Sequence, residues 1–84
     1  MINNKLKESE IFSTQELSLV AALIAWGFTL DSIDKTTPSK VTFIFTRDYF
    51  LDQAIQSFWN NSAQVPPKTY FQALREVKSR IYGE

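Results

Sequence analysis

Residues 12–28 read FSTQELSLVAALIAWGF, and the ten residues LSLVAALIAW within them include one polar side chain. Such a run is a membrane anchor, a core helix or a docking surface. Even when it is extended to Leu30 the apolar stretch covers 14 residues, whereas a membrane-spanning helix needs about 20. A signal peptide is not indicated either, because the preceding MINNKLKESE is polar and of mixed charge. We therefore expect a core helix and no membrane span.

The flanking residues indicate both ends of this helix. Ser13 and Glu16 have the spacing of a capping box, in which each side chain accepts a hydrogen bond from the other residue's backbone N–H. Gly27 can adopt the left-handed conformation that commonly ends a helix. The sequence therefore predicts a helix from about residue 14 to residue 26.

One face of the predicted helix carries small residues, which we call the small-residue strip: Ser18, Ala21, Ala22 and Ala25. The other faces are broadly apolar, and a helix that is apolar nearly all round is buried or contacts a partner. We expect the strip to lie against another element of the same chain. The alternative is a self-association surface, in which Ser18, Ala22 and Ala25 would form part of a protein interface.

A hairpin is predicted after this helix. Residues 28–35 show short-range alternation, residues 36–39 read TTPS and resemble a turn, and KVTFIFT at 40–46 is the clearest strand in the chain. The side chains of that strand expected on its core face are Val41, Phe43 and Phe45.

Two further helices complete the chain. Thr46 or Asp48 can cap the first of them, which ends at the Asn60-Asn61 pair. Pro67 suits the first position of the second helix, which is expected to run from about residue 67 to residue 82.

The predicted fold is a single small α+β domain of order α-β-β-α-α, in which a two-stranded antiparallel hairpin packs with three helices. Its expected extent is residues 12–84, preceded by a loosely ordered segment at residues 1–11.

The composition excludes several kinds of chemistry. The 84 residues include no Cys and no His, which removes disulfides, thiol nucleophiles, imidazole bases and the usual zinc and haem ligands. We expect no metal, no cofactor and no enzymatic activity. The lack of Cys also fits a reducing compartment, so a cytoplasmic location is expected.

With thiol and imidazole chemistry excluded, pairs of carboxylates are the remaining candidates for catalysis. Asp31 and Asp34 fall at a strand end, and Asp48 and Asp52 fall in the first turn of a helix. Acid–base catalysis needs one pKa to be raised by burial or by a neighbouring charge, and nothing in the sequence marks either pair as buried. We interpret them as solvated turn and helix-start residues.

The last helix has two distinct faces. Its core face is expected to carry Tyr70, Leu74, Val77 and Ile81. A second face interleaves cations with aromatic rings: Lys68, Phe71, Arg75, Lys78 and Tyr82. With Arg80 nearby and Glu76 as the only acid, residues 67–82 carry a net charge of +3.

Two interpretations of this second face stay open. Cations near the end of a helix also favour the helix dipole, and Phe71 can widen the core face. Alternatively the cations bind phosphates or an acidic protein, and the rings stack on bases.

Trp59 is a second candidate for binding. It follows Phe58 directly, so the two rings cannot face the same way along a helix. An exposed Trp is typical of a protein interface, whereas a Trp folded over the Val65-Pro66-Pro67 segment would seal the core.

The pattern FSTxELxLxAAxxxAxGF, VxFxF, FWN and YxxAxRxxKSxIY covers residues 12–28, 41–45, 58–60 and 70–82. This combination resembles a small bacterial and bacteriophage family that is known as a domain of unknown function. The resemblance implies a short free-standing protein, often close to mobile elements, and it assigns no catalytic residue.

The expected function is therefore binding of a macromolecule without catalysis. The first hypothesis is a protein-interaction or self-assembling module that uses Trp59 or the small-residue strip. The alternative is a small nucleic-acid-binding accessory protein that uses the basic last helix. Salt distinguishes them, because phosphate contacts weaken steeply as salt rises and apolar interfaces change little.

Overall fold

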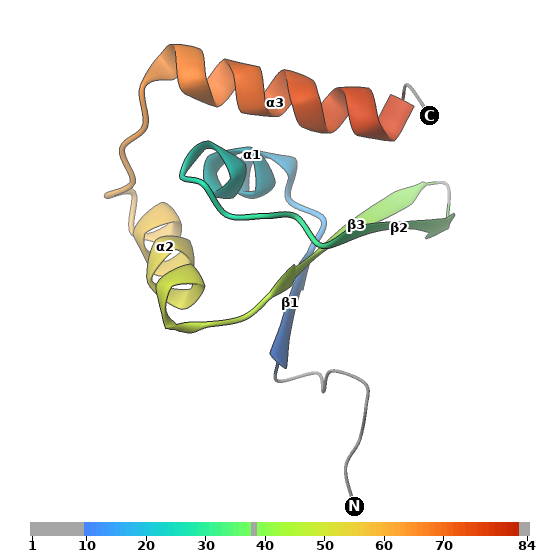
Figure 1. Ribbon diagram of the computed structural model, residues 1–84, viewed down its shortest axis with the longest axis horizontal. Coiled ribbons are helices and arrows are strands. Elements are labelled where there is room, and N and C mark those ends of the chain that lie inside the picture. The colour runs from blue at the N-terminus through green and yellow to red at the C-terminus, as the bar shows by residue number, and fades with distance from the viewer. Residues whose placement is uncertain (1–9, 38, 83–84) are drawn as a thin grey trace, which may run out of the picture.

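The computed structural model describes residues 10–37 and 39–82. In this part of the chain three strands form one sheet and three helices pack on each other and on the sheet (Figure 1). The elements are β1 (Ile11–Thr14), α1 (Leu17–Ala25), β2 (Ser32–Thr37), β3 (Lys40–Thr46), α2 (Tyr49–Trp59) and α3 (Pro67–Tyr82). The α+β class and the three helices are confirmed, whereas the sheet has three strands instead of the two predicted, and the element order differs by the additional strand.

The difference lies in β1, which the sequence analysis missed. β1 and β2 both pair with the central strand β3 in antiparallel fashion, giving the order β1-β3-β2. Phe12 lies opposite Phe45, and it packs against the buried core. As a strand, residues 11–14 pair their backbone groups with β3 and pack Phe12 against the core, which a helix start at these positions would not do.

The predicted capping box is wrong for the same reason. Ser13 pairs with Ile44 in the sheet, and α1 begins at Leu17 with Glu16 as an N-cap that makes no side-chain cap bond. The turn between strand and helix is held instead by the Glu16 N–H, which donates to Thr14 Oγ1 at 3.0 Å. A hydroxyl in this segment does stabilise the turn, but it is one residue later than the pattern indicated.

The C-terminal end of α1 is as predicted. Gly27 has a φ of 101°, its N–H donates to the Ile24 carbonyl, and the Phe28 N–H donates to the Leu23 carbonyl. These two bonds form a Schellman motif, which satisfies carbonyls that the helix itself leaves without partners.

β2 and β3 form the predicted hairpin, with a later start for β2. The first strand begins at Ser32, and Ile33 lies opposite Phe43. Phe43 and Phe45 are buried and Val41 packs against them, which confirms the predicted core face of β3. Near the turn the register is irregular between Asp34 and Thr37, because the Asp34 carboxylate accepts both the backbone N–H and the hydroxyl of Thr36.

α1 occupies the centre of the core. Residues 19–23 are all buried, and in Figure 1 α1 lies between α3 and the sheet. The buried cluster joins every layer of the fold: Leu19, Val20, Leu23, Leu30, Phe43, Phe45, Leu51 and Val77. This answers the question raised by the apolar run, since a helix surrounded by other elements has no polar face to present.

The small-residue strip faces the interior rather than a free surface. Ala21 and Ala22 are buried, Ser18 and Ala25 are half-buried, and α1 packs most extensively against α3. Tyr70 of α3 donates its hydroxyl to the Ser18 carbonyl at 3.2 Å. Because Ala21 and Ala22 are buried within a single chain, the expected packing of the strip against another element of the chain is confirmed.

The predicted helices α2 and α3 are confirmed. Of the two candidate caps for α2, Asp48 is the one used, because its carboxylate accepts the Leu51 N–H at 2.7 Å. Thr46 instead ends β3 and donates its hydroxyl to Asp31. α3 spans Pro67–Tyr82, and Trp26 Nε1 donates to the Gln64 carbonyl at 2.9 Å, which fixes the loop between the two helices.

The expectation of a loosely ordered segment at residues 1–11 falls outside the described residues, apart from its last two positions. Of these, Ile11 is the first residue of β1, and the Glu10 carbonyl accepts the Arg47 N–H at 2.9 Å. The sheet therefore begins one residue before the predicted domain boundary at residue 12.

Candidate functional site

The outer face of α3 carries the mixed row of cations and rings that its sequence indicated. We call this row the α3 stripe: Lys68, Phe71, Arg75, Lys78 and Tyr82. Its five residues are spaced three or four apart, which places them along one side of the helix. All five are exposed, and the exposed fractions of Phe71 and Tyr82 are 59% and 79%. The possibility that Phe71 widens the core face is therefore wrong.

The stripe is long enough to contact several phosphates. The rise from Lys68 to Tyr82 is roughly 21 Å at about 1.5 Å per residue. Lys68, Arg75 and Lys78 are spread along this length, so they can contact different phosphates of one strand.

Arg80 does not belong to the stripe. It lies two residues from both Lys78 and Tyr82, so it points to another side of α3, and it is half-buried. Its backbone carbonyl accepts from Lys35 Nζ at 3.3 Å. This bond involves the backbone of Arg80 at the end of α3, and its side chain lies outside the row of stripe residues.

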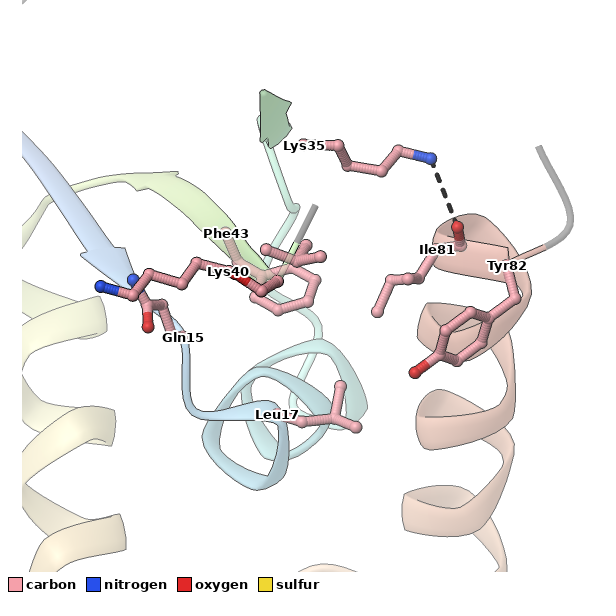
Figure 2. Close-up of a pocket in the computed structure, with 9 residues that line it drawn as sticks. Gln15, Leu17, Lys35, Lys40, Phe43, Ile81 and Tyr82 are labelled. Atoms are coloured by element: carbon pink, nitrogen blue, oxygen red, sulfur yellow. Dashed lines mark hydrogen bonds between the residues drawn. The ribbon is translucent and has the colours of Figure 1, made fainter. Parts of the chain in front are cut away.

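A groove lies where the end of α3 meets the β2–β3 hairpin, and we call it the hairpin groove. Its volume is about 600 Å³, and Figure 2 shows the side chains around it. Leu17, Phe43 and Ile81 provide apolar walls, and Lys40 and Tyr82 lie on opposite sides of the opening in that view. The groove therefore adjoins the last residue of the α3 stripe.

Lys35 links the two walls of the groove. Its ammonium donates to the carbonyls of Arg80 and Ile81 at 3.3 and 3.4 Å (Figure 2). These carbonyls belong to the last turn of α3, where a cation is favoured by the helix dipole. Lys35 was not among the predicted site residues, because a contact between residues 45 positions apart leaves no pattern in the neighbouring sequence.

Several acidic side chains in the described residues are bound to neighbours in the structure. The Glu16 carboxylate accepts from Ser18 Oγ at 2.6 Å, and Asp34 accepts from Thr36. The hydrogen bonds from Thr36 hold the pKa of Asp34 below its usual value. These acids serve local structure, as the interpretation of turn and helix-start residues proposed.

Asp52 is bound in a different way, by an ion pair. Its carboxylate accepts from Arg47 Nε at 3.2 Å and from Arg47 Nη2 at 3.0 Å. The hydrogen bonds from Arg47 lower the pKa of Asp52, and those to Asp52 raise the pKa of Arg47. Within the described residues no polar or charged side chain is buried, so both carboxylate pairs are open to solvent.

Charge is separated across the molecule. Among the described residues, every cation except Arg47 lies on α3 or at the tip of the hairpin: Lys35, Lys40, Lys68, Arg75, Lys78 and Arg80. The acids in those two places are Asp34 and Glu76, while the other described acids lie just before β1, on the turns that precede α1 and β2, and at the start of α2. One side of the domain is thus suited to an anionic ligand.

Trp59 is exposed at the end of α2. Its exposed fraction is 61%, and its ring packs edge-on against Phe58 with a centroid distance of 5.0 Å and an interplanar angle of 87°. The indole that contacts the loop before α3 is that of Trp26, not Trp59. The candidates for a protein interface therefore differ in exposure. Trp59 is open to solvent, whereas Ala22 is buried and Ser18 and Ala25 are half-buried.

Two exposed rings were missed by sequence reasoning. Tyr49 and Phe50, at the start of α2, are 69% and 70% exposed and pack edge-on at 5.5 Å. By helical spacing with Ala54, Ile55 and Phe58, either Phe50 or Leu51 could lie on the core face, and the structure buries Leu51. The Asp48 cap would have decided between them, because it fixes where the helix begins and hence which residue faces inward.

Within residues 10–37 and 39–82, no group of three or more Asp or Glu side chains is arranged to hold a metal ion. In the same residues, no helix has both the length and the apolar character needed to cross a membrane.

One family model matches this chain over residues 9–83, and the family is described as "Domain of unknown function (DUF5659)". The chain belongs to this family. The DUF5659 match includes both the α3 stripe and the hairpin groove, and it confirms the resemblance to a small domain of unknown function. No curated protein and no solved structure matches the chain.

Proposed function

We propose that this DUF5659 domain binds single-stranded nucleic acid through the α3 stripe. The observation that carries the proposal is the exposure of Phe71 and Tyr82 between three exposed cations on one face of a helix. Cations neutralise phosphates along a strand, and exposed rings stack on bases.

The rings favour a single strand over a duplex as the ligand. A base can stack on a protein ring when it is unpaired, whereas bases within a duplex already stack on each other. Burying such a large apolar surface would also offset the cost of ordering Lys and Arg side chains. Electrostatic attraction alone would not require rings at these positions.

The separation of charge supports the same side of the molecule. Glu76 is the only acid on α3, and it lies next to Arg75 in sequence and three residues before Ser79, away from the stripe positions. The pair formed by Arg47 and Asp52 lies at the start of α2 and adds no net charge. An approaching anion is therefore steered towards α3 and the hairpin tip.

The test is a titration of the protein into a labelled single-stranded oligonucleotide at 50 and 200 mM salt. Three stripe cations on a single strand give a slope of log affinity against log salt of about −2.1, so affinity falls about twentyfold between the two salt concentrations. No binding at 50 mM salt would refute the proposal.

A charge variant locates the interface. Lys68→Gln, Arg75→Gln and Lys78→Gln together are expected to reduce the slope by about 2.1, because each removed phosphate contact reduces it by about 0.7. Glu76→Gln is the matched control on the same helix, and it should bind at least as tightly as the native protein. If the triple variant kept the native slope, the interface would lie elsewhere.

A ring variant tests stacking separately. Phe71→Ala removes no charge and, at an exposed fraction of 59%, leaves the core intact. Loss of one stacked base costs about 1–3 kcal/mol, so affinity should fall at least about fivefold with an unchanged salt slope. Equal binding by native protein and variant would leave only an electrostatic contact and contradict the single-strand preference.

Trp59 supports a second candidate function, which is binding of a protein partner or a second copy of the chain. Its ring is exposed yet held by Phe58, and a rigid, partly exposed Trp is a typical interface anchor. Sedimentation at several protein concentrations tests the self-association case. A dimer in the native protein that Trp59→Ser abolishes would support it, whereas a monomer at high micromolar concentration would exclude a stable homodimer.

The biological setting we propose is the cytoplasm of a bacterium or of a bacteriophage-infected cell, with a role that does not involve catalysis. The resemblance described above supports the bacterial or bacteriophage origin. The lack of Cys fits a reducing compartment, and the lack of both His and Cys supports a binding role.

A further inference from the structure

We infer that the hairpin groove is a nucleotide-binding site that receives one base and its phosphate from the strand bound along the α3 stripe. This inference rests on the proposed function and assigns a role to residues outside α3. It makes the β2–β3 hairpin the second half of the interface.

The size and lining of the groove fit this ligand. Its volume of about 600 Å³ lies within the range of about 300–1,000 Å³ that is typical of small-molecule sites. The apolar side chains of Leu17, Val41, Phe43 and Ile81 give a base a surface to cover, while Gln15 and Ser39 offer polar atoms at the rim. A base is flat and largely apolar on its faces but polar at its edge, so it needs both kinds of lining.

The charges at the groove are complementary to a phosphate. Lys35 and Lys40 line it, and none of its lining residues is acidic. Lys35 Nζ donates to two carbonyls of α3, and an ammonium has a third N–H that can donate to a ligand. The two nearest acids in sequence, Glu16 and Asp34, are hydrogen-bonded to Ser18 and Thr36.

Tyr82 connects the groove to the stripe. Its ring is 79% exposed and it is both the last stripe residue and a wall of the groove (Figure 2). A strand that passes Lys78 and stacks on Tyr82 therefore meets the groove next, without leaving the positively charged side. The same position explains why a duplex is a poorer ligand, since a paired base cannot turn into the groove.

Two probes test the inference: octathymidylate and a duplex of eight base pairs, each at 50 and 200 mM salt. Lys40→Gln removes a groove cation, and Lys78→Gln is its matched stripe variant. Lys78→Gln is expected to weaken the binding of both probes. Lys40→Gln should weaken octathymidylate about two- to fivefold and reduce its salt slope by about 0.7, with little change for the duplex.

A second variant separates base entry from charge. Ser39→Leu places a bulky side chain without an aromatic ring at the rim of the groove and changes no charge, and residue 39 is exposed, so the fold should be retained. It should weaken octathymidylate at least about threefold while leaving the salt slope unchanged, as expected from steric exclusion of a base with phosphate contacts kept. Thermal unfolding of each variant checks that the domain is intact.

The outcomes distinguish the two proposals. If Lys78→Gln weakens binding but Lys40→Gln and Ser39→Leu do not, the groove inference is wrong and the proposal for the stripe stands. If the native protein binds neither probe at 50 mM salt, the proposed function fails first. If an octaglutamate peptide binds in a Lys40-dependent way and octathymidylate does not, the groove takes an acidic peptide and the nucleotide assignment is overturned.

Discussion

The helices α1 and α3 pack against each other, yet they present opposite kinds of surface. α1 has nine residues, and five of them in a row, residues 19–23, are buried. α3 has sixteen residues, of which Ala73 and Val77 are buried. Because residues 19–23 of α1 are all buried, packing in the core determines which side chains they can carry. The outer face of α3 is exposed to solvent and is not constrained by packing in the core, so its side chains are available to bind a partner.

This difference separates the effects of substitution. A change in α1 should alter the free energy of unfolding, whereas a change on the outer face of α3 should alter binding and leave stability unchanged. The measurements below test whether effects on stability and effects on binding come from different helices.

The largest expected effect comes from the centre of α1. Leu23 is fully buried, so Leu23→Ala should reduce the free energy of unfolding by about 2–5 kcal/mol through lost burial and a residual cavity. Tyr82→Ala on α3, where the ring is 79% exposed, should change it by less than about 0.5 kcal/mol. Urea unfolding measures both values, and comparable losses in the two variants would break the division between the helices.

Overpacking the contact between the helices should have the next largest effect. Ala21 is fully buried on the small-residue strip, so Ala21→Leu is expected to cost about 1–3 kcal/mol. Gln72→Leu is the matched control, because Gln72 is exposed on α3. If Ala21→Leu kept native stability and instead changed the sedimentation of the protein, the strip would be a surface between molecules.

The helices α1 and α2 differ in how their N-termini are capped. The Asp48 carboxylate accepts the Leu51 N–H, whereas α1 has no side-chain cap, so Asp48→Ala should cost about 1 kcal/mol. Ser13→Ala should cost less than about 0.5 kcal/mol, since Ser13 is an exposed strand residue. Urea midpoints of the two variants compare a predicted cap that forms, Asp48 at α2, with a predicted cap that does not, Ser13 at α1.

The smallest expected effect depends on pH. Arg47 lowers the pKa of Asp52, so the pair stabilises the fold above about pH 4, and this stabilisation is lost as the pH falls through the folded-state pKa. Asp52→Asn should therefore be less stable than the native protein at pH 7, with a difference that shrinks by pH 3. Urea midpoints at the two pH values measure it, and an equal difference at both would show that the ion pair is not the cause.

Local signals were sufficient for most of the fold. The alternation of KVTFIFT, the helix-ending Gly27 and the Pro67 start of α3 all act within a few residues, and each element formed where its pattern indicated. β1 was missed because its formation depends on β3, about thirty residues later. At residues 12–16 the same hydroxyl and carboxylate suit a capping box or a strand followed by a turn, and pairing with Phe45 decides between them.

The candidate site divides along the same line. The α3 stripe could be predicted, because helical spacing alone places its five residues on one face, and the structure exposes all of them. The hairpin groove could not, because it forms between Lys35, Lys40 and the end of α3, which are distant in sequence. Arg80 was grouped with the stripe by its charge and its proximity in sequence, although its angular position on the helix separates it.

The two indoles of the chain occupy different environments, and this gives the protein two internal spectroscopic reporters. Trp26 is half-buried and donates to the Gln64 carbonyl, so its emission should shift when the core opens. Trp59 is 61% exposed, so a water-soluble quencher should reach it in the folded state. Replacing Trp59 by Phe would leave a single-tryptophan protein whose fluorescence follows unfolding, and replacing Trp26 would leave one that follows contacts made at the surface.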